Sequence, residues 1–243
     1  MERAKTAIIF GATSGIGKSL AETLVKDNYI VGVTGRRLEK LQALQNDYPN
    51  QIIVKQNDIQ QVEEVEKVFN ELVNELGDVD IVIQSSGVGF VNTELDWNKE
   101  NETVQTNVVG VTKLYDLAYN LFEKQQFGHL VGISSIASFR GSKDAPAYFA
   151  SKAFQKSYLE GLYIKTKTVP SKKVFVTDIR PGFVDTAMAL GDGIFWMVSL
   201  EKATRQIYAA IKRKKRVAYI SKRWRLIAWV LKVVSTKILK MAT

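Results

Sequence analysis

A tyrosine and a lysine lie four positions apart in the chain, at Tyr148 and Lys152. On a helix, residues i and i+4 share a face, so the phenol and the ammonium would point into one small volume. A phenol ordinarily ionises at about pH 10, and a neighbouring ammonium lowers this pKa because it favours the phenolate. Such a pair can move a proton to or from a carbonyl or alcohol oxygen. Taken alone, the spacing also fits a half-buried tyrosine beside a solvated lysine.

A glycine-rich segment lies near the start of the chain, from Gly11 to Gly17. Residues 5–10 before it have the pattern of a buried strand, and a helical pattern begins near Ile16. Glycines between a strand and a helix let the backbone approach a pyrophosphate, and the helix N-terminus presents N–H groups to it. The spacing Gly-x-x-x-Gly-x-Gly predicts a nucleotide-binding loop, with a glycine turn that binds no ligand as the alternative.

Strand-like and helix-like segments alternate along most of the chain. Strands are expected at residues 30–34, 51–55, 79–83, 129–134 and 173–177, and helices at residues 62–76, 103–122 and 148–166. This alternation predicts an α/β fold, a Rossmann-type doubly wound parallel sheet in a single domain. Ligands of such sheets bind at the carboxyl ends of the strands. The residues that would line this edge follow the expected strands: Gly11, Gly35, Asp58, Ser85, Ser135 and Pro181.

Taken together, these motifs resemble the classical short-chain dehydrogenases/reductases over about residues 5–190. The motifs that carry the resemblance are the glycine segment 11–17, Asn57-Asp58-Ile59, Asn107, Ile133-Ser134-Ser135, Tyr148 with Lys152, and Arg180-Pro181-Gly182. The resemblance implies that Tyr148 is the catalytic acid/base and that Lys152 lowers the pKa of Tyr148 and holds the nicotinamide ribose. It implies that Ser135 bonds the substrate oxygen, and the spacing to Tyr148 favours Ser135 over Ser134. It also implies that Asn107 helps to hold a water that links Lys152 to a proton relay, with an exposed helix position as the alternative.

The same resemblance assigns the cofactor contacts. In the glycine segment these are Gly11, Thr13, Ser14, Gly15, Ile16 and Gly17. Asp58, followed by Ile59, would bond the adenine amine, with an ordinary helix N-cap as the alternative. The segment with Pro181, Gly182, Val184 and Thr186 would cover the nicotinamide and bond its amide.

One motif departs from the family. Where the family carries Asn-Asn-Ala-Gly after the fourth strand, this chain has Gln84-Ser85-Ser86-Gly87. Gly87 keeps the close backbone approach, so we expect only modest effects on cofactor affinity. The catalytic set of Asn107, Ser135, Tyr148 and Lys152 is complete.

The end of the second expected strand bears on the choice of cofactor. An NAD-preferring enzyme places a carboxylate there to bond the ribose 2′-hydroxyl, whereas this chain has Gly35 followed by Arg36 and Arg37. Guanidinium groups bind a 2′-phosphate well. We therefore expect NADP(H), with Arg36 as the first contact, Arg37 as the second and Ser14 as a further hydroxyl contact. The alternative is that one arginine merely starts the next helix in solvent.

Composition limits the remaining chemistry. The 243 residues contain no cysteine and a single histidine, His129, which excludes disulfides, thiol catalysis and a His-rich metal site. His129 starts an apolar run, so a structural role is favoured. We see no signal peptide and no apolar stretch long enough to span a bilayer, and we expect a cytoplasmic protein that binds no metal.

The C-terminal segment carries all of the excess positive charge. The net charge is +9, and Glu201 is the last acidic residue. After a basic cluster at residues 212–216, a strand is expected at 217–220. We divide the chain into a nucleotide-binding domain, 1–221, and a basic amphipathic helix, 222–243. Ile227, Leu231, Val234 and Ile238 share its apolar face, flanked by Trp224 and Trp229.

This segment predicts a peripheral contact with a membrane, because a basic amphipathic helix with tryptophans suits the bilayer interface. The alternative is a helix packed on the body or in a dimer contact. Nucleic acid is not favoured, since no recognised binding motif accompanies the charges.

The segment 183–199 indicates a hydrophobic substrate, because it contains Met188, Leu190, Phe195, Trp196 and Met197. These residues could equally pack on the protein or on a partner subunit. The resemblance implies a homo-oligomer that transfers hydride from NADPH to a ketone or aldehyde, reversibly, and we expect a lipid-like substrate. The alternative is an NADP(H)-binding sensor or interaction protein without turnover.

Overall fold

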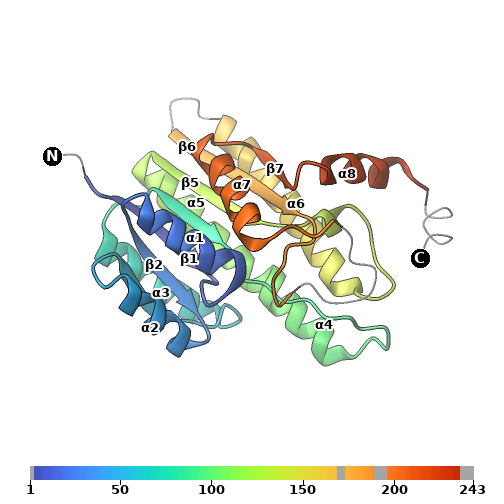
Figure 1. Ribbon diagram of the computed structural model, residues 1–243, viewed down its shortest axis with the longest axis horizontal. Coiled ribbons are helices and arrows are strands. Elements are labelled where there is room, and N and C mark those ends of the chain that lie inside the picture. Colours follow the sequence, from blue (N-terminus) through green and yellow to red (C-terminus); the bar gives the residue numbers. More distant parts are fainter. Residues whose placement is uncertain (1–2, 169–172, 189–195, 236–243) are drawn as a thin grey trace.

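The computed structural model describes residues 3–168, 173–188 and 196–235, and within them the chain forms one parallel sheet of seven strands in the order β3-β2-β1-β4-β5-β6-β7 (Figure 1). The strands are β1 (Lys5–Phe10), β2 (Tyr29–Gly35), β3 (Ile52–Gln56), β4 (Ile81–Gln84), β5 (Phe127–Ile133), β6 (Lys173–Pro181) and β7 (Val217–Ile220). The predicted doubly wound parallel sheet is thus confirmed, including the strand expected at 217–220.

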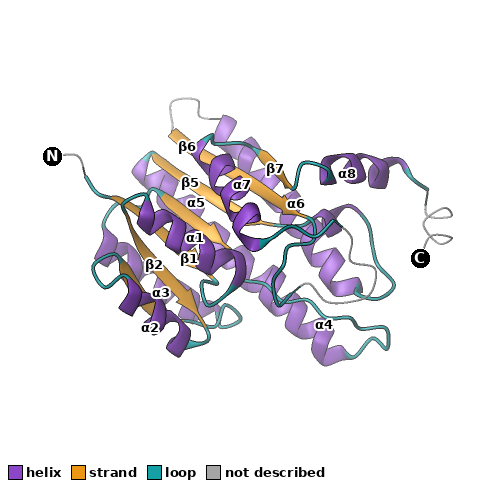
Figure 2. Cartoon of the chain, viewed as in Figure 1, coloured by secondary structure: helices purple, strands orange, loops and turns teal. Residues whose placement is uncertain are grey.

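Helices cover both faces of the sheet (Figure 2). One face packs against α1 (Gly15–Lys26), α2 (Leu38–Asp47) and α7 (Leu200–Lys212), and the other against α3 (Val62–Leu76), α5 (Val111–Gln125) and α6 (Pro146–Lys167). Side chains alternate between the two faces along a strand. In β1, Ala7 and Ile9 therefore join the first cluster, and Ile8 and Phe10 join the second.

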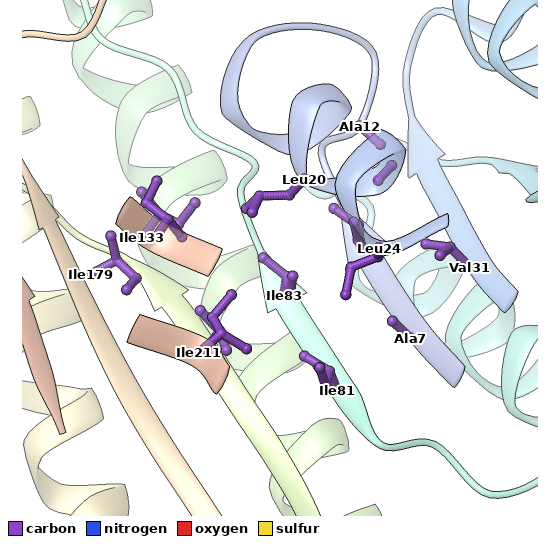
Figure 3. Packing of buried hydrophobic residues seen from close by; sticks show 14 of the residues in the cluster. Ala7, Ala12, Leu20, Leu24, Val31, Ile81, Ile83, Ile133, Ile179 and Ile211 are labelled. Atoms are coloured by element: carbon purple, nitrogen blue, oxygen red, sulfur yellow. The ribbon is translucent and has the colours of Figure 1, made fainter. Parts of the chain in front are cut away.

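An apolar core lies between the sheet and the helices on each face. The removal of these side chains from water is the main force that holds the helices onto the sheet. Figure 3 shows Leu20 and Leu24 of α1 and Ile211 of α7 beside sheet residues Ile83 and Ile179. All five are fully buried or nearly so. His129 is also interior: its Nε2 lies 2.7 Å from the Thr177 hydroxyl, and burial lowers its pKa to about 3. The structural role expected for His129 agrees with this setting.

The strand order reverses between β1 and β4. The chain runs outward from β1 to β3 and then crosses back to β4 on the other side of β1, so the two halves of the sheet diverge at this point. The carboxyl ends of β1 and β4 therefore flank a crevice, the usual ligand position in such sheets. The glycine segment after β1 and Ser85 after β4 meet there, since a Cβ added to Gly11 would lie 2.5 Å from the Ser86 nitrogen.

The helix expected over residues 103–122 is not continuous. The chain forms α4 (Trp97–Val104), then a π-helix (η1, Gln105–Gly110), then α5. Gly110 lies against the strand-to-helix connection before α3, where an added Cβ would be 1.9 Å from the Ile59 carbonyl oxygen. Such π-turns occur frequently at functional sites, and this one carries Asn107.

The C-terminal helix is shorter than expected. It forms α8 (Trp224–Val233) rather than spanning 222–241: Val234 has extended backbone angles, and Arg140 donates hydrogen bonds to the carbonyls of Leu231 and Val234. Ile238 lies outside the described residues. In Figure 1, α8 lies beyond β7 at the edge of the molecule.

The faces of α8 also differ from the expectation. Trp224 and Ala228 are buried on the body, and Ile227 and Leu231 are half-buried. The predicted apolar face is therefore partly used for packing, in line with the alternative of a helix packed on the body. The side chains that remain exposed form another stripe: Leu226, Trp229, Val230 and Val233. No helix among the described residues is both long and apolar enough to cross a membrane.

Candidate active site

Tyr148, Lys152 and Ser135 lie at the carboxyl end of β5. Tyr148 and Lys152 occupy the first two turns of α6, which begins at Pro146, and Ser135 precedes a short 3₁₀ helix (η2, Ile136–Phe139). The Ser135 hydroxyl accepts a hydrogen bond from the Ala137 amide at 3.1 Å and makes a second with Tyr148. The fold thus brings the predicted residues together.

The neighbouring serine has a different setting. The Ser134 hydroxyl donates to the Asp178 carboxylate and to the Ile179 carbonyl oxygen, and its side chain is buried. A hydroxyl held in this way is already engaged in the interior. The geometry therefore agrees with the choice of Ser135 over Ser134.

The phenol of Tyr148 differs from the expectation in one respect. Burial raises its pKa above the ordinary value, and the Ser135 hydrogen bond opposes this shift without reversing it. The Lys152 amine lies 5.9 Å from the centroid of the Tyr148 ring. The expected lowering by Lys152 is absent because desolvation dominates and the ammonium is engaged elsewhere. Tyr148 is therefore protonated at neutral pH.

The Lys152 side chain is buried beneath Gly87. Its amine donates to the Ile133 carbonyl at 3.0 Å and to the Gln155 side-chain oxygen at 3.0 Å. A Cβ added to Gly87 would lie 3.7 Å from the amine. Burial lowers the pKa of Lys152 to about 8, and the charge of Asp178 acts in the opposite direction. Because this pKa is close to neutral pH, a small change in the surroundings of the Lys152 amine alters the fraction of the amine that is charged.

Asn107 connects η1 to the catalytic turn of α6. Its amide nitrogen donates to the Val88 carbonyl at 2.7 Å and to the Ser151 hydroxyl at 3.0 Å, and its side-chain oxygen accepts from the Val88 amide at 2.9 Å. Ser151 in turn donates to the Tyr148 carbonyl at 2.7 Å. Asn107 is fully buried, unlike the exposed position considered as an alternative. Its relay role stays a prediction.

The glycine segment and the start of α1 have the form that a pyrophosphate requires. Gly11 and Gly15 have φ angles of +93° and +55°, which favour glycine. A Cβ on Gly17 would lie 2.0 Å from the Gly11 carbonyl oxygen. Within the described residues, the N-cap Ser14 makes no side-chain hydrogen bond to the helix. The first N–H groups of α1 are thus available to an anion, so the residues present fit the phosphates of a dinucleotide.

The two arginines after β2 lie in different surroundings. Arg37 donates to the hydroxyls of Thr13, at 2.5 Å, and Ser14, at 2.9 Å, on the glycine segment. Arg36 instead forms an exposed ion pair with Glu102 of α4, at 3.6 Å. Arg37, rather than Arg36, therefore lies against the glycine segment, and the order of their contacts to a 2′-phosphate stays a prediction.

The other predicted cofactor residues gather along the same edge. Asp58 accepts a hydrogen bond from the Gln60 amide, and the N-cap of α3 is Gln61, so Asp58 is not the helix cap. Thr186 approaches the glycine segment, where a Cβ on Gly15 would lie 3.4 Å from its methyl group. Of the remaining predicted contacts, Ile16 lies in α1 and Pro181 ends β6, while the others lie in the connections after β3, β4 and β6: Ile59, Gly87, Gly182 and Val184.

Two glutamines that the sequence did not single out as site residues complete the interior. Gln84, in place of the family's asparagine, is fully buried, accepts from the Tyr115 hydroxyl at 3.1 Å and donates to the Ser86 carbonyl. Gln155 bonds Lys152, and its position three residues after Lys152 on one helix was the signal available. No group of three or more metal-ligating side chains occurs among the residues that the structure describes.

Comparison with known proteins gives a consistent result. The sequence model of a family described as short chain dehydrogenase matches residues 5–192. An uncharacterised oxidoreductase of Myxococcus xanthus is 33% identical over 189 residues, covering 76% of this chain and 74% of the relative.

Two solved structures resemble the fold. ElxO with NADP bound superposes with a TM-score of 0.77 at 22% identity, covering 89% of this chain and 97% of ElxO. A short-chain dehydrogenase/reductase from Burkholderia phymatum in complex with NAD gives 0.82 at 17% identity, covering 95% and 94% of the two chains.

Proposed function

Because the chain belongs to the short-chain dehydrogenase family, we propose that it is an NADP(H)-dependent oxidoreductase that reduces a ketone or aldehyde to an alcohol, reversibly. The observation that carries the proposal is the meeting of Ser135, Tyr148 and Lys152 at the sheet edge that also holds the glycine segment. Spectrophotometric assay of NADPH and NADH oxidation with a panel of ketones and aldehydes tests it. No turnover with any member, despite tight NADPH binding, would favour the sensor alternative.

The reaction requires a hydride and a proton. NADPH, when bound, supplies the hydride to the carbonyl carbon. Tyr148 donates its phenolic proton to the carbonyl oxygen. Its raised pKa keeps the phenol protonated, and so able to donate, at neutral pH. Ser135 donates a hydrogen bond to the same oxygen as negative charge develops there. Lys152 would hold the ribose hydroxyls through its ammonium group, although it does not lower the pKa of Tyr148 in the structure.

Carbonyl reduction should slow as the pH rises through about 8. Lys152 loses its proton in this range because burial lowers its pKa to about 8, while the phenol of Tyr148, whose pKa is raised, still holds its proton. Alcohol oxidation needs the phenolate and should have its optimum at a higher pH than reduction. Initial rates in both directions from about pH 6 to about pH 10 check this. A reduction rate that rises through this range would contradict the assigned roles.

The NADP(H) preference rests on the charge at the end of β2. Arg37 reaches the glycine segment, and the strand ends in Gly35 rather than in the carboxylate of an NAD-preferring site. The adenosine 2′-phosphate would replace the serine and threonine hydroxyls as the acceptor of Arg37. A charge-assisted contact of this kind contributes more than a neutral hydrogen bond.

A hydrophobic, lipid-like substrate is favoured by the side chains near the site. Met188, Trp196 and Met197 are exposed to nearly half of their surface, although large apolar side chains are usually covered. Leu190 and Phe195 of the same segment lie outside the described residues. Long-chain ketones in micelles should therefore be turned over faster than small ketones. The homo-oligomer implied by the family stays a prediction, which light scattering would check.

We also propose a peripheral contact of α8 with anionic membranes. Leu226, Trp229, Val230 and Val233 are spaced i, i+3, i+4 and i+7, so they share one helical face, and each is at least 42% exposed. The basic residues around this stripe are exposed as well: Lys222, Arg223, Arg225 and Lys232. An apolar stripe with basic flanks fits an anionic bilayer surface.

Co-sedimentation of the full chain with vesicles tests this contact. Vesicles of phosphatidylcholine and phosphatidylserine should bind the protein, whereas pure phosphatidylcholine should bind it more weakly. The double variant Leu226→Ser/Trp229→Ser should lose at least about ten-fold in binding, since two large apolar side chains no longer enter the bilayer. Trp97→Ser, at an exposed tryptophan of α4, is the matched control. Equal binding of the two variants to the vesicles would show that α8 does not make the membrane contact.

A further inference from the structure

Gln155 joins the amine of Lys152 to the backbone of the π-helix. Its side-chain oxygen accepts from the Lys152 amine at 3.0 Å, and its side-chain nitrogen donates to the Asn107 carbonyl at 2.7 Å. The side chain is fully buried. Both ends of the amide are thus engaged, one with α6 and one with η1, and the amide spans the space between Lys152 and the Asn107 carbonyl.

A buried amide in this place has a specific physical consequence. An unpaired polar group in the interior is destabilising, so the amide is stable here because both of its ends have partners. Each of those partners comes from a different element, which fixes α6 and η1 relative to one another at the level of the catalytic lysine. Displacing the amide would remove one of the acceptors of the Lys152 amine and one of the contacts of the turn that carries Asn107.

The charges around Lys152 make this contact important. From the sheet, Asp178 of β6 is the charged group that acts on it, and that carboxylate is engaged by Ser134 and by Arg180 at 2.6 Å. From α6, Tyr148 faces the amine with a protonated phenol. From η1, Asn107 contributes no charge. Among the residues that the structure describes, the ammonium donates to two neutral oxygens, those of Ile133 and Gln155.

We propose that Gln155 is a positioning residue for the reaction proposed above: it holds the Lys152 amine in place and favours its charged form. The amide oxygen stabilises the ammonium without the full charge of a carboxylate, which would draw the amine away from the ribose and from Tyr148. Gln155 is fully buried and bonded to the Lys152 amine, so it acts through Lys152. The inference rests on the proposed function for its catalytic meaning, but the Gln155–Lys152 contact can be tested without turnover.

Thermal unfolding at two pH values isolates the contact. In Gln155→Met, which keeps the length of the side chain, Lys152 loses an acceptor and the pKa of its amine falls further. A lysine whose folded pKa is lowered is held less tightly as a cation by the fold, so the Tm loss of Gln155→Met should be larger at pH 7 than at pH 9, where Lys152 is neutral in either protein. In a Lys152→Met background the Tm loss should no longer depend on pH.

The pH profile of kcat/KM supplies the second readout. The alkaline limb, assigned to Lys152, should move down by about one pH unit in Gln155→Met and up by a similar amount in Gln155→Glu, whose carboxylate favours the ammonium. Opposite shifts from two side chains of nearly equal size would not arise from packing alone. Gln155→Glu also serves if Gln155→Met fails to fold.

The inference is overturned if the Tm loss is the same at both pH values and in both backgrounds, or if both variants shift the limb in one direction. Turnover that is absent in the wild-type protein as well would count against the proposed function, while the unfolding measurement would still decide on the contact.

Discussion

Replacing Tyr148 with phenylalanine should lower kcat/KM for carbonyl reduction by about three orders of magnitude, the size expected for loss of general acid catalysis. Phenylalanine keeps the ring that packs against Phe149 and beside Gly89 but cannot donate a proton. The dissociation constant for NADPH should change little, because the glycine segment, Arg37 and Lys152 are untouched. Stopped assays of turnover and fluorescence titration of NADPH measure the two quantities separately.

Tyr163→Phe is the matched control, because Tyr163 lies on the same helix away from the site. It should keep wild-type turnover. Substantial activity in Tyr148→Phe would assign the proton to another group. A loss of NADPH binding in Tyr148→Phe would show instead that the variant disturbs the fold of the site.

Arg37→Ala should raise the KM for NADPH by about ten- to a hundred-fold, the loss expected for a charge-assisted contact with a phosphate. The KM for NADH should stay nearly constant, because NADH carries no 2′-phosphate. The preference between the two cofactors should therefore largely disappear. Steady-state kinetics with each cofactor at saturating substrate provide the measurement.

Arg36→Ala is the neighbouring control. Its exposed pair with Glu102 predicts a much smaller effect on NADPH. A large effect of Arg36→Ala with none of Arg37→Ala would restore the order suggested by the sequence. If both variants keep the preference for NADPH over NADH, neither arginine binds the 2′-phosphate, and the argument for NADP(H) from these residues fails.

The spacing of apolar residues predicted helices and strands well where that spacing alone decides which side chains face the core. The helix expected at 62–76 coincides with α3, because its apolar residues at Val65, Phe69 and Leu72 recur at helical spacing and face the sheet. The meeting of Tyr148, Lys152 and Ser135 also follows, since parallel strands deliver their carboxyl ends to one edge.

Other features depend on contacts that no local pattern contains. The π-turn at Asn107 arises where Gly110 packs against Ile59, residues far apart in sequence. The raised pKa of Tyr148 follows from burial, which the four-residue spacing to Lys152 does not reveal. α8 ends at Val233 because Arg140 reaches its last carbonyls from another element.

The sequence also does not tell which of the two adjacent arginines contacts the glycine segment. Arg36 and Arg37 differ by one position, yet only Arg37 reaches the hydroxyls of the glycine segment, because successive residues at a strand end point in different directions. The sequence identifies two guanidinium groups after β2, and the backbone decides which of them lies against the glycine segment.

The most direct test of the central claim is transfer of deuterium from NADPH labelled at both C4 positions to a panel of long-chain and small ketones, followed by mass spectrometry of the alcohols. We expect one deuterium at the carbinol carbon of a long-chain product, formed about a thousand-fold more slowly with Tyr148→Phe. Tight NADPH binding without deuterium in any product would contradict the assignment as a carbonyl reductase and favour a nucleotide sensor.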